Sequence, residues 1–182
     1  MTEHQIEKLA VKFRSAIVAA RDAGEFSSDI TFHHFPRGCC GDTSYLLAEF
    51  LKNHGYETIW VSTERGDWSH AWLVLKDGRV KEPTPRSFEW PEEIKVVIEG
   101  YGAFEPEKIV DITRYEAEDI ENGLIIDITS DQFDDWDYPV YVGFMNPFYR
   151  TFNFNQAHDY DGLNDIGGRL SRLYRIVLRH IF

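Results

Sequence analysis

The two cysteines of this chain are the residues whose placement most directly suggests chemistry. Cys39 and Cys40 are adjacent, follow a turn that contains Pro36 and Gly38, and precede apolar residues at helical spacing. A thiol at the start of a helix faces unpaired backbone N–H groups and the positive end of the helix dipole, and both favour the reactive thiolate. We therefore expect a nucleophilic cysteine at the N-terminus of a central, apolar helix.

The most strongly patterned strand of the sequence carries a histidine that can act as a base. Residues 69–75 read Ser-His-Ala-Trp-Leu-Val-Leu, and the period of two sets His70 on one strand face with Trp72 and Val74. An imidazole on a strand that packs beside the cysteine helix can accept the proton of the thiol. We therefore predict His70 as the general base.

A carboxylate stands inside the next strongly apolar strand. Residues 124–129 read Leu-Ile-Ile-Asp-Ile-Thr, and burying Asp127 there is costly unless the carboxylate is paired. Asp127 can accept a hydrogen bond from His70 and so fix the tautomer of the ring. Each placement alone has an ordinary explanation: a core cysteine, a satisfied core histidine, or an aspartate that caps a turn. A Cys–His–Asp triad accounts for all three at once.

These three segments, in this order, resemble the transglutaminase-like branch of the papain-like cysteine enzymes. The family shares a Gly-x-Cys opening, a His-Ala-Trp strand and an Asp-x-Thr strand, which correspond here to Gly38–Cys40, His70–Trp72 and Asp127–Thr129. The similarity covers roughly residues 36–143. It implies an α+β fold in which the cysteine helix packs on an antiparallel sheet. It also implies a triad that works without metal or organic cofactor.

The Gly-x-Cys register of that family selects Cys40 as the nucleophile. Helical spacing agrees, since Cys40 shares a face with Ser44 and Leu47. Asp42 is a complication, because a carboxylate two residues after the thiol opposes thiolate formation, although it suits the first turn of a helix. We expect His70, as imidazolium, to outweigh it.

Further residues are candidates for supporting roles in the site. We consider His34, Gln132 and Cys39 for oxyanion stabilisation or support of the triad, with an ordinary loop histidine as the favoured alternative for His34. Trp68 and Trp72 are candidates for the walls of a substrate cleft.

A zinc site is the alternative interpretation of the cysteines. It would use His33, His34, Cys39 and Cys40. Neighbouring cysteines rarely share one zinc, and the chain has no Cys-x-x-Cys spacing. We therefore expect no metal.

The predicted function is cysteine-dependent acyl chemistry on an amide or ester. Peptidase, amidase, deamidase and transglutaminase-like transfer activities all use the same machinery, and the substrate is a peptide, a protein or a small amide. The alternative is a catalytically inactive papain-like binding module.

The remaining pattern predicts a single domain over residues 1–182. We expect an insertion at about 81–121 that covers one side of the core, and loop-like structure over 144–166. The expected regular elements are a helix at 2–23, the cysteine helix at 40–53, strands at 56–63, 69–75, 124–129 and 138–143, and an amphipathic helix at 167–182.

The C-terminal helix carries a stripe of four arginines beside an apolar stripe. The arginines are Arg169, Arg172, Arg175 and Arg179. Pairing with the chain's own carboxylates is the favoured role, ahead of a membrane surface, and self-association or partner binding through this helix is a further option.

Composition narrows the function classes. A formal net charge of −12 argues against nucleic-acid binding, because phosphates would be repelled. No apolar run approaches membrane-spanning length. Adjacent cysteines cannot form an ordinary structural disulfide, which favours a reducing, cytoplasmic setting.

Overall fold

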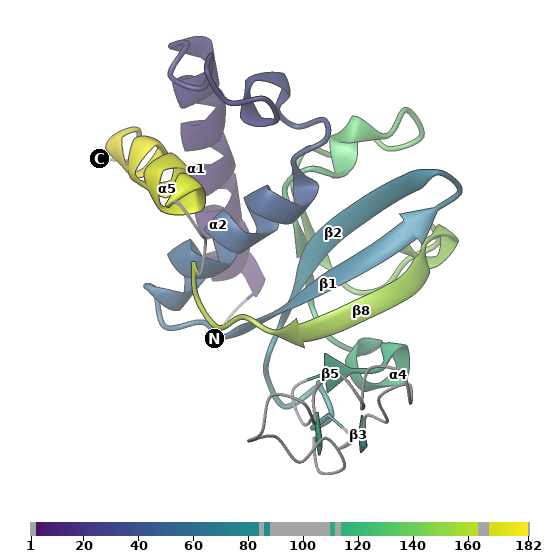
Figure 1. The fold of residues 1–182 in the computed structure, drawn as a ribbon. Helices are drawn as coiled ribbons and strands as arrows, with labels where there is room; N and C mark the ends of the chain where they lie inside the picture. Colours follow the sequence, from purple (N-terminus) through teal and green to yellow (C-terminus); the bar gives the residue numbers. More distant parts are fainter. Residues whose placement is uncertain (1–2, 84–85, 88–109, 112–113, 164–167, 182) are drawn as a thin grey trace, which may run out of the picture.

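The computed structural model describes residues 3–83, 86–87, 110–111, 114–163 and 168–181. Three helices lie together on one side of a six-stranded sheet (Figure 1). The elements are α1 (Glu3–Asp22), η1 (Phe32–His34), α2 (Cys40–Lys52), β1 (Thr58–Arg65), β2 (Trp68–Leu75), β3 (Arg86–Ser87), β4 (Val110–Asp111), β5 (Arg114–Tyr115), α4 (Ala117–Ile120), β6 (Ile125–Asp127), η3 (Ser130–Gln132), β7 (Tyr141–Gly143), η4 (Tyr149–Thr151), β8 (Asn153–Asp159) and α5 (Arg169–Arg179).

The sheet is antiparallel throughout, in the order β5-β8-β1-β2-β6-β7. Strands β1 and β2 form a hairpin whose register pairs Thr63 with His70, and β6 pairs with β2 through Leu73 and Ile126. The predicted α+β class and the antiparallel sheet are therefore confirmed. The strand that bears His70 lies inside the sheet, next to the strand that bears Asp127.

The two faces of the sheet are buried against different clusters. On one face, residues of α1, α2 and α5 pack against Leu73 of β2 and Ile126 of β6. On the other face, Trp72 packs with aromatic residues of η4 and the segment after it, among them Tyr149 and Phe152. His70 lies in this second, aromatic cluster, since its ring contacts Trp72 and Phe152.

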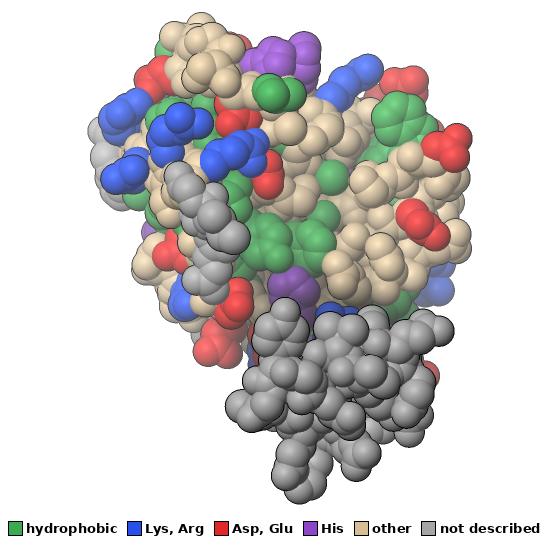
Figure 2. Space-filling model, viewed as in Figure 1, with side chains coloured by type: hydrophobic (Ala, Val, Ile, Leu, Met, Phe, Trp, Pro, Cys, Tyr) green, Lys and Arg blue, Asp and Glu red, His purple; other side chains and the backbone are tan. Residues whose placement is uncertain are grey.

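Helix α5 packs through its apolar stripe and pairs its arginines with carboxylates of the same chain. Its buried residues are Leu173 and Val177. Arg169 donates to Asp29 and to Asp42, and Arg179 donates to Glu25. Figure 2 shows Lys and Arg side chains gathered on the face where Figure 1 places this helix. The preference for the chain's own carboxylates is thus confirmed for Arg169 and Arg179, and within the described ranges no helix combines the length and hydropathy that a bilayer crossing requires.

The expectation of loop-like structure over residues 144–166 is wrong. Seven of these residues form β8, which pairs with both β1 and β5. The segment is polar, Asn-Phe-Asn-Gln-Ala-His-Asp, and only Ala157 is fully buried in it. Its position therefore depends on backbone pairing with β1, which a hydrophobic pattern does not reveal.

The predicted insertion at 81–121 lies largely outside the described residues. Its described parts are β3 paired with β4, β5 at the edge of the main sheet, and α4. The side that the insertion covers and its suggested role as a lid or substrate wall therefore stay predictions.

Candidate active site

The N-terminus of α2, the turn of the β1–β2 hairpin and the segment that follows β6 contribute residues to one cleft; these elements can be found in Figure 1. A cleft of about 570 Å³ opens among these three segments. The residues that line this cleft include Cys40, Arg65, Trp68, Ser69, Gln132 and Phe133. The sequence-predicted nucleophile therefore faces a cleft, and the other predicted residues can be placed relative to it.

Cys40 is the first residue of α2 and is 9% exposed. Its Sγ lies 3.9 Å from the carbonyl oxygen of Ser69, the residue before His70 in β2. Burial raises the pKa of the Cys40 thiol, but the hydrogen bond and charge of His70 lower this pKa by more than burial raises it. The net pKa is therefore below the ordinary value. Cys40 therefore has the electrostatic surroundings of a reactive cysteine.

Cys39 has the opposite surroundings. It is the N-cap of α2, is 2% exposed, and belongs to the helical side of the core. Its sulfur accepts a hydrogen bond from Thr43 at 3.5 Å and lies 3.5 Å from the carbonyl oxygen of Pro36. Burial raises the pKa of the Cys39 thiol to about 12. The structure thus separates the two adjacent thiols into a core residue and a cleft residue.

His70 and Asp127 form a buried pair. His70 Nε2 donates to Asp127 Oδ2 at 2.7 Å, and the two side chains are 0% and 1% exposed. The register that pairs Leu73 with Ile126 sets Asp127 on the same sheet face as His70, one residue further along β6. Burial alone lowers the pKa of His70, but the charge and hydrogen bond of Asp127 raise it to about 9.

Asp127 is held by hydrogen bonds on both oxygens. Its Oδ1 accepts from the backbone N–H of Thr129 at 2.8 Å and from the Thr129 hydroxyl at 3.2 Å. Its Oδ2 accepts from Tyr149 at 3.1 Å as well as from His70. Burial raises the pKa of Asp127, but His70 and these donors bring it below its usual value. The carboxylate therefore both caps the turn after β6 and fixes the imidazole.

The second nitrogen of His70 is in contact with Gln132. Gln132 Nε2 lies 3.0 Å from His70 Nδ1, and Gln132 also lines the cleft. The sequence analysis considered Gln132 for a supporting role, and the structure brings it to the imidazole. His70 itself is buried and does not line the cleft.

Arg65 was missed by the sequence analysis, although it lines the cleft. It donates to both carboxylate oxygens of Asp135, at 2.8 and 3.0 Å. Its guanidinium lies 4.6 Å from the ring centre of Phe133 and 4.7 Å from that of Phe152, and both rings contact His70. Arg65 therefore holds the aromatic wall around the imidazole. An arginine at the end of a strand gives no sequence signal for this, because its partners are 68 or more residues away.

Arg14 of α1 was also missed by the sequence analysis, which expected a helix at 2–23 but named no site residue on it. It donates to the carbonyl oxygen of Ile128 and, at 2.6 Å, to Asp131 Oδ2. These two acceptors flank Thr129 and precede Gln132, so Arg14 fixes the segment that carries the contacts of Asp127 and His70. The signal in the sequence is an arginine directly after the core residue Phe13.

The charge of Asp42, two residues after Cys40, is matched by an arginine. Arg169 Nη1 donates to Asp42 Oδ2 at 2.6 Å, and the same guanidinium donates to Asp29 at 2.8 and 2.9 Å. Burial raises the pKa of Asp29, but Arg169 and local N–H and hydroxyl donors bring it well below the ordinary value. Helix α5 thereby reduces the opposition of Asp42 to thiolate formation that the sequence indicated.

Other predicted site residues lie in different places. Trp68 is 70% exposed and lines the cleft with Cys40, whereas Trp72 is buried in the aromatic cluster and lines a separate depression on the far face. His34 is exposed, its ring lies 3.6 Å from that of His33, and it does not line the cleft. Among the described residues no three His, Cys, Asp or Glu side chains gather as metal ligands would, so the alternative zinc set is not brought together.

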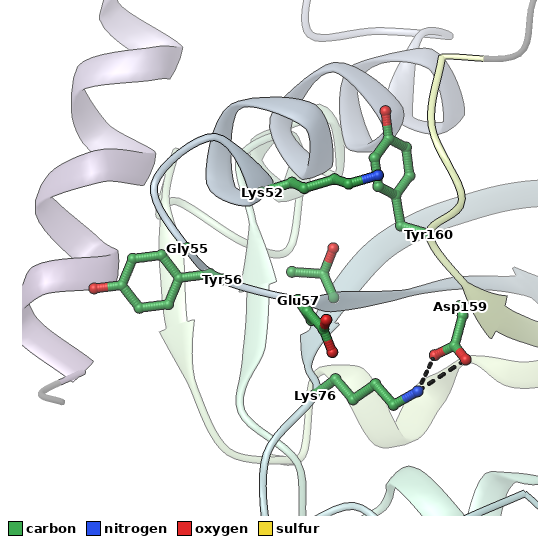
Figure 3. A pocket seen from close by; sticks show the side chains of 8 residues that line it. Lys52, Gly55, Tyr56, Glu57, Lys76, Asp159 and Tyr160 are labelled. Carbon is green, nitrogen blue, oxygen red and sulfur yellow. Dashed lines mark hydrogen bonds and ion pairs between the residues drawn. The ribbon is translucent and has the colours of Figure 1, made fainter.

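A second pocket of about 410 Å³ lies at the other end of α2 (Figure 3). Lys52 reaches toward the ring of Tyr160 on one side of it, and Lys76 donates to both oxygens of Asp159 on the other. The ring of Tyr56 points away from these groups. The residues that line this pocket include no cysteine and no histidine, so it lacks the residue types that distinguish the first cleft.

No family model, no curated protein and no solved structure matches this chain in the three comparisons with known proteins.

Proposed function

We propose that this protein carries out cysteine-dependent acyl chemistry on an amide or ester, in the manner of the transglutaminase-like branch of the papain-like enzymes. The observation that supports this most directly is the buried His70–Asp127 pair beside Cys40, whose thiol pKa is lowered at the start of α2. The order of the three residues in the chain and the antiparallel sheet under the cysteine helix agree with that family's arrangement.

In the first half of the reaction the Cys40 thiolate attacks the carbonyl carbon of the substrate. The electron pair of the carbonyl moves to oxygen, and the backbone N–H of Cys40 is a donor for this oxyanion, because the first turn of a helix leaves its N–H groups without intrahelical acceptors. The bond to the leaving group then breaks, and His70 Nδ1 gives its proton to the leaving amine or alcohol. The product is a thioester on Cys40.

In the second half His70 acts as a base. It takes a proton at Nδ1 from water or from an amine, which attacks the thioester carbonyl and expels the Cys40 thiolate. Throughout both halves Nε2 keeps its hydrogen and donates it in a hydrogen bond to Asp127. This bond keeps the ring in one orientation. Water as acceptor gives hydrolysis or deamidation, and an amine gives transfer. The substrate is a peptide, a protein or a small amide.

The test is the reactivity of Cys40 toward an ester and an alkylating agent. Exposure to p-nitrophenyl acetate should leave an acetyl group on Cys40, located by mass spectrometry of peptides. Iodoacetamide near pH 6, below the ordinary pKa of a thiol, should alkylate Cys40 fast. His70→Ala should slow both reactions, whereas His54→Ala, an exposed histidine at the far end of α2, should leave them unchanged. Equal, slow chemistry in all three proteins would overturn the proposal.

The second candidate function is a binding module of the same fold without turnover. One observation favours it: Gln132 occupies the His70 nitrogen that would exchange protons with Cys40. A module of this kind would show slow alkylation near pH 6 and no acyl-enzyme, so the same experiment separates the two functions.

A further inference from the structure

Both ring nitrogens of His70 have a polar partner in this structure. Nε2 lies 2.7 Å from a carboxylate oxygen of Asp127, which only accepts, so Nε2 carries hydrogen. The amide nitrogen of Gln132 lies 3.0 Å from Nδ1 and can donate to it only while Nδ1 carries no hydrogen. With the amide in this position Nδ1 is not available to the proton of Cys40, even though Asp127 raises the pKa of His70.

We propose that Gln132 competes with Cys40 for Nδ1 of His70 and so acts as a latch on the nucleophile. This inference depends on the proposed function, because it concerns the same thiol and imidazole. With the Gln132 amide on Nδ1, His70 is neutral and Cys40 stays a thiol. When the amide leaves, the S–H bond breaks and an Nδ1–H bond forms, which gives the thiolate and the imidazolium. No electrons are gained or lost in this step.

The surroundings of Gln132 allow such movement. It is the last residue of η3, it is only partly buried, and its side chain borders the open cleft of about 570 Å³. His70, in contrast, is 1% exposed and fixed by Asp127. The mobile member of the pair is therefore the glutamine.

The groups around the imidazole make the proton transfer favourable once the amide leaves. Asp127 from β6 is the charged group in contact with the ring, and the phenol of Tyr149 from η4 donates to that same carboxylate. Phe133 and Phe152 cover the ring, and the guanidinium of Arg65 lies beyond them, against Asp135. A carboxylate in direct contact favours the imidazolium more than a cation behind two aromatic rings opposes it.

The experiment compares Gln132→Ala and Gln132→Glu with the parent protein and with Gln156→Ala, a substitution at an exposed glutamine of β8. The readouts are the iodoacetamide rate at Cys40 as a function of pH and the ultraviolet absorbance of the thiolate, both without substrate. Gln132→Ala should raise the rate near pH 6 by about two- to tenfold, the value of one neutral hydrogen bond. Gln132→Glu should lower the rate, because a carboxylate accepts the Nδ1–H that the thiolate needs. Gln156→Ala should match the parent.

Each outcome bears on the latch. An unchanged or slower rate in Gln132→Ala, with an unchanged thermal unfolding midpoint, overturns it. If that variant is unfolded, Gln132→Asn serves instead, since its shorter amide cannot span to Nδ1 and should give the same increase. The failure of the latch is distinguishable from failure of the proposed function: in the first case His70→Ala still slows alkylation, and in the second it does not.

Discussion

The two ends of helix α2 each border a carboxylate paired with a nitrogen base, and the surroundings of the two pairs differ. Beside the N-terminus, His70 and Asp127 meet at 2.7 Å with side chains 0% and 1% exposed. Near the C-terminus, Lys76 and Asp159 meet at 2.8 Å with side chains 28% and 36% exposed (Figure 3). Similar distances thus occur in very different solvent environments.

The difference in burial indicates which pair can take part in catalysis. A solvent-exposed ion pair costs little to break, because water replaces the partner. A buried pair has no such replacement, so it fixes one tautomer and changes the pKa of an adjacent thiol. Burial together with a nucleophile, rather than the pair itself, marks the N-terminal end of α2 as the candidate site.

The sharpest test of this contrast is the pair of thiols. Cys40→Ser should abolish acyl-enzyme formation, because a serine hydroxyl has no lowered pKa and is not activated by the same base to a useful extent. Cys39→Ser should retain most of the activity, since its side chain lies in the core and not in the cleft. Equal loss in both variants, with folding verified by circular dichroism, would contradict the separation of the two thiols.

The next largest effect is expected at the carboxylate. Asp127→Asn should lower kcat by a factor on the order of 10⁴, because the amide no longer fixes the imidazole in the required tautomer. The variant should still fold, since an Asn Oδ1 can accept from the backbone N–H of Thr129 as Asp127 does. Steady-state turnover of an ester checks the first expectation and urea unfolding the second. Activity equal to that of the parent would assign Asp127 to the turn alone.

The pH dependence of stability should distinguish the two ends of α2. The pKa of His70 is raised to about 9 from an ordinary 6.5, so the buried pair stabilises the fold fully below pH 6.5 and loses that contribution as the pH rises through about 9. The contribution corresponds to roughly 3 kcal/mol. His70→Gln should therefore be destabilised more at pH 6 than at pH 10, as urea unfolding at both pH values measures. A pH-independent difference between the two proteins would contradict a raised His70 pKa.

The residues of the candidate triad were accessible to sequence analysis because each one departs from a local pattern. A thiol at a helix start, a ring inside the strand at 69–75 and a carboxylate inside the strand at 124–129 are all visible within a few neighbours. The sequence identified Gln132 only as one candidate for a supporting role. Its contact with His70 could not be predicted, because the two residues are 62 positions apart.

The other contacts around the candidate site, and strand β8, could be identified only from the folded structure. Arg14 reaches Asp131 across 117 residues, and Arg169 reaches Asp42 across 127, so neither pairing has a signature in local spacing. Strand β8 was missed for a related reason. Its polar residues bury little, and its place beside β1 is set by backbone hydrogen bonds between distant segments.

The smallest effect is expected at the C-terminal end of α2. Lys76→Met removes the cationic partner of Asp159 but keeps most of the side-chain volume, and a partly exposed pair of this kind contributes about 0.2–1 kcal/mol. The free energy of unfolding in urea should fall by no more than this amount. The loss should be the same at pH 6 and pH 8, because Lys76 stays charged over that range. The alkylation rate of Cys40 should not change. A large loss of stability, or a change in Cys40 reactivity, would show that the two ends of α2 are coupled through the helix, and the contrast between them would then fail.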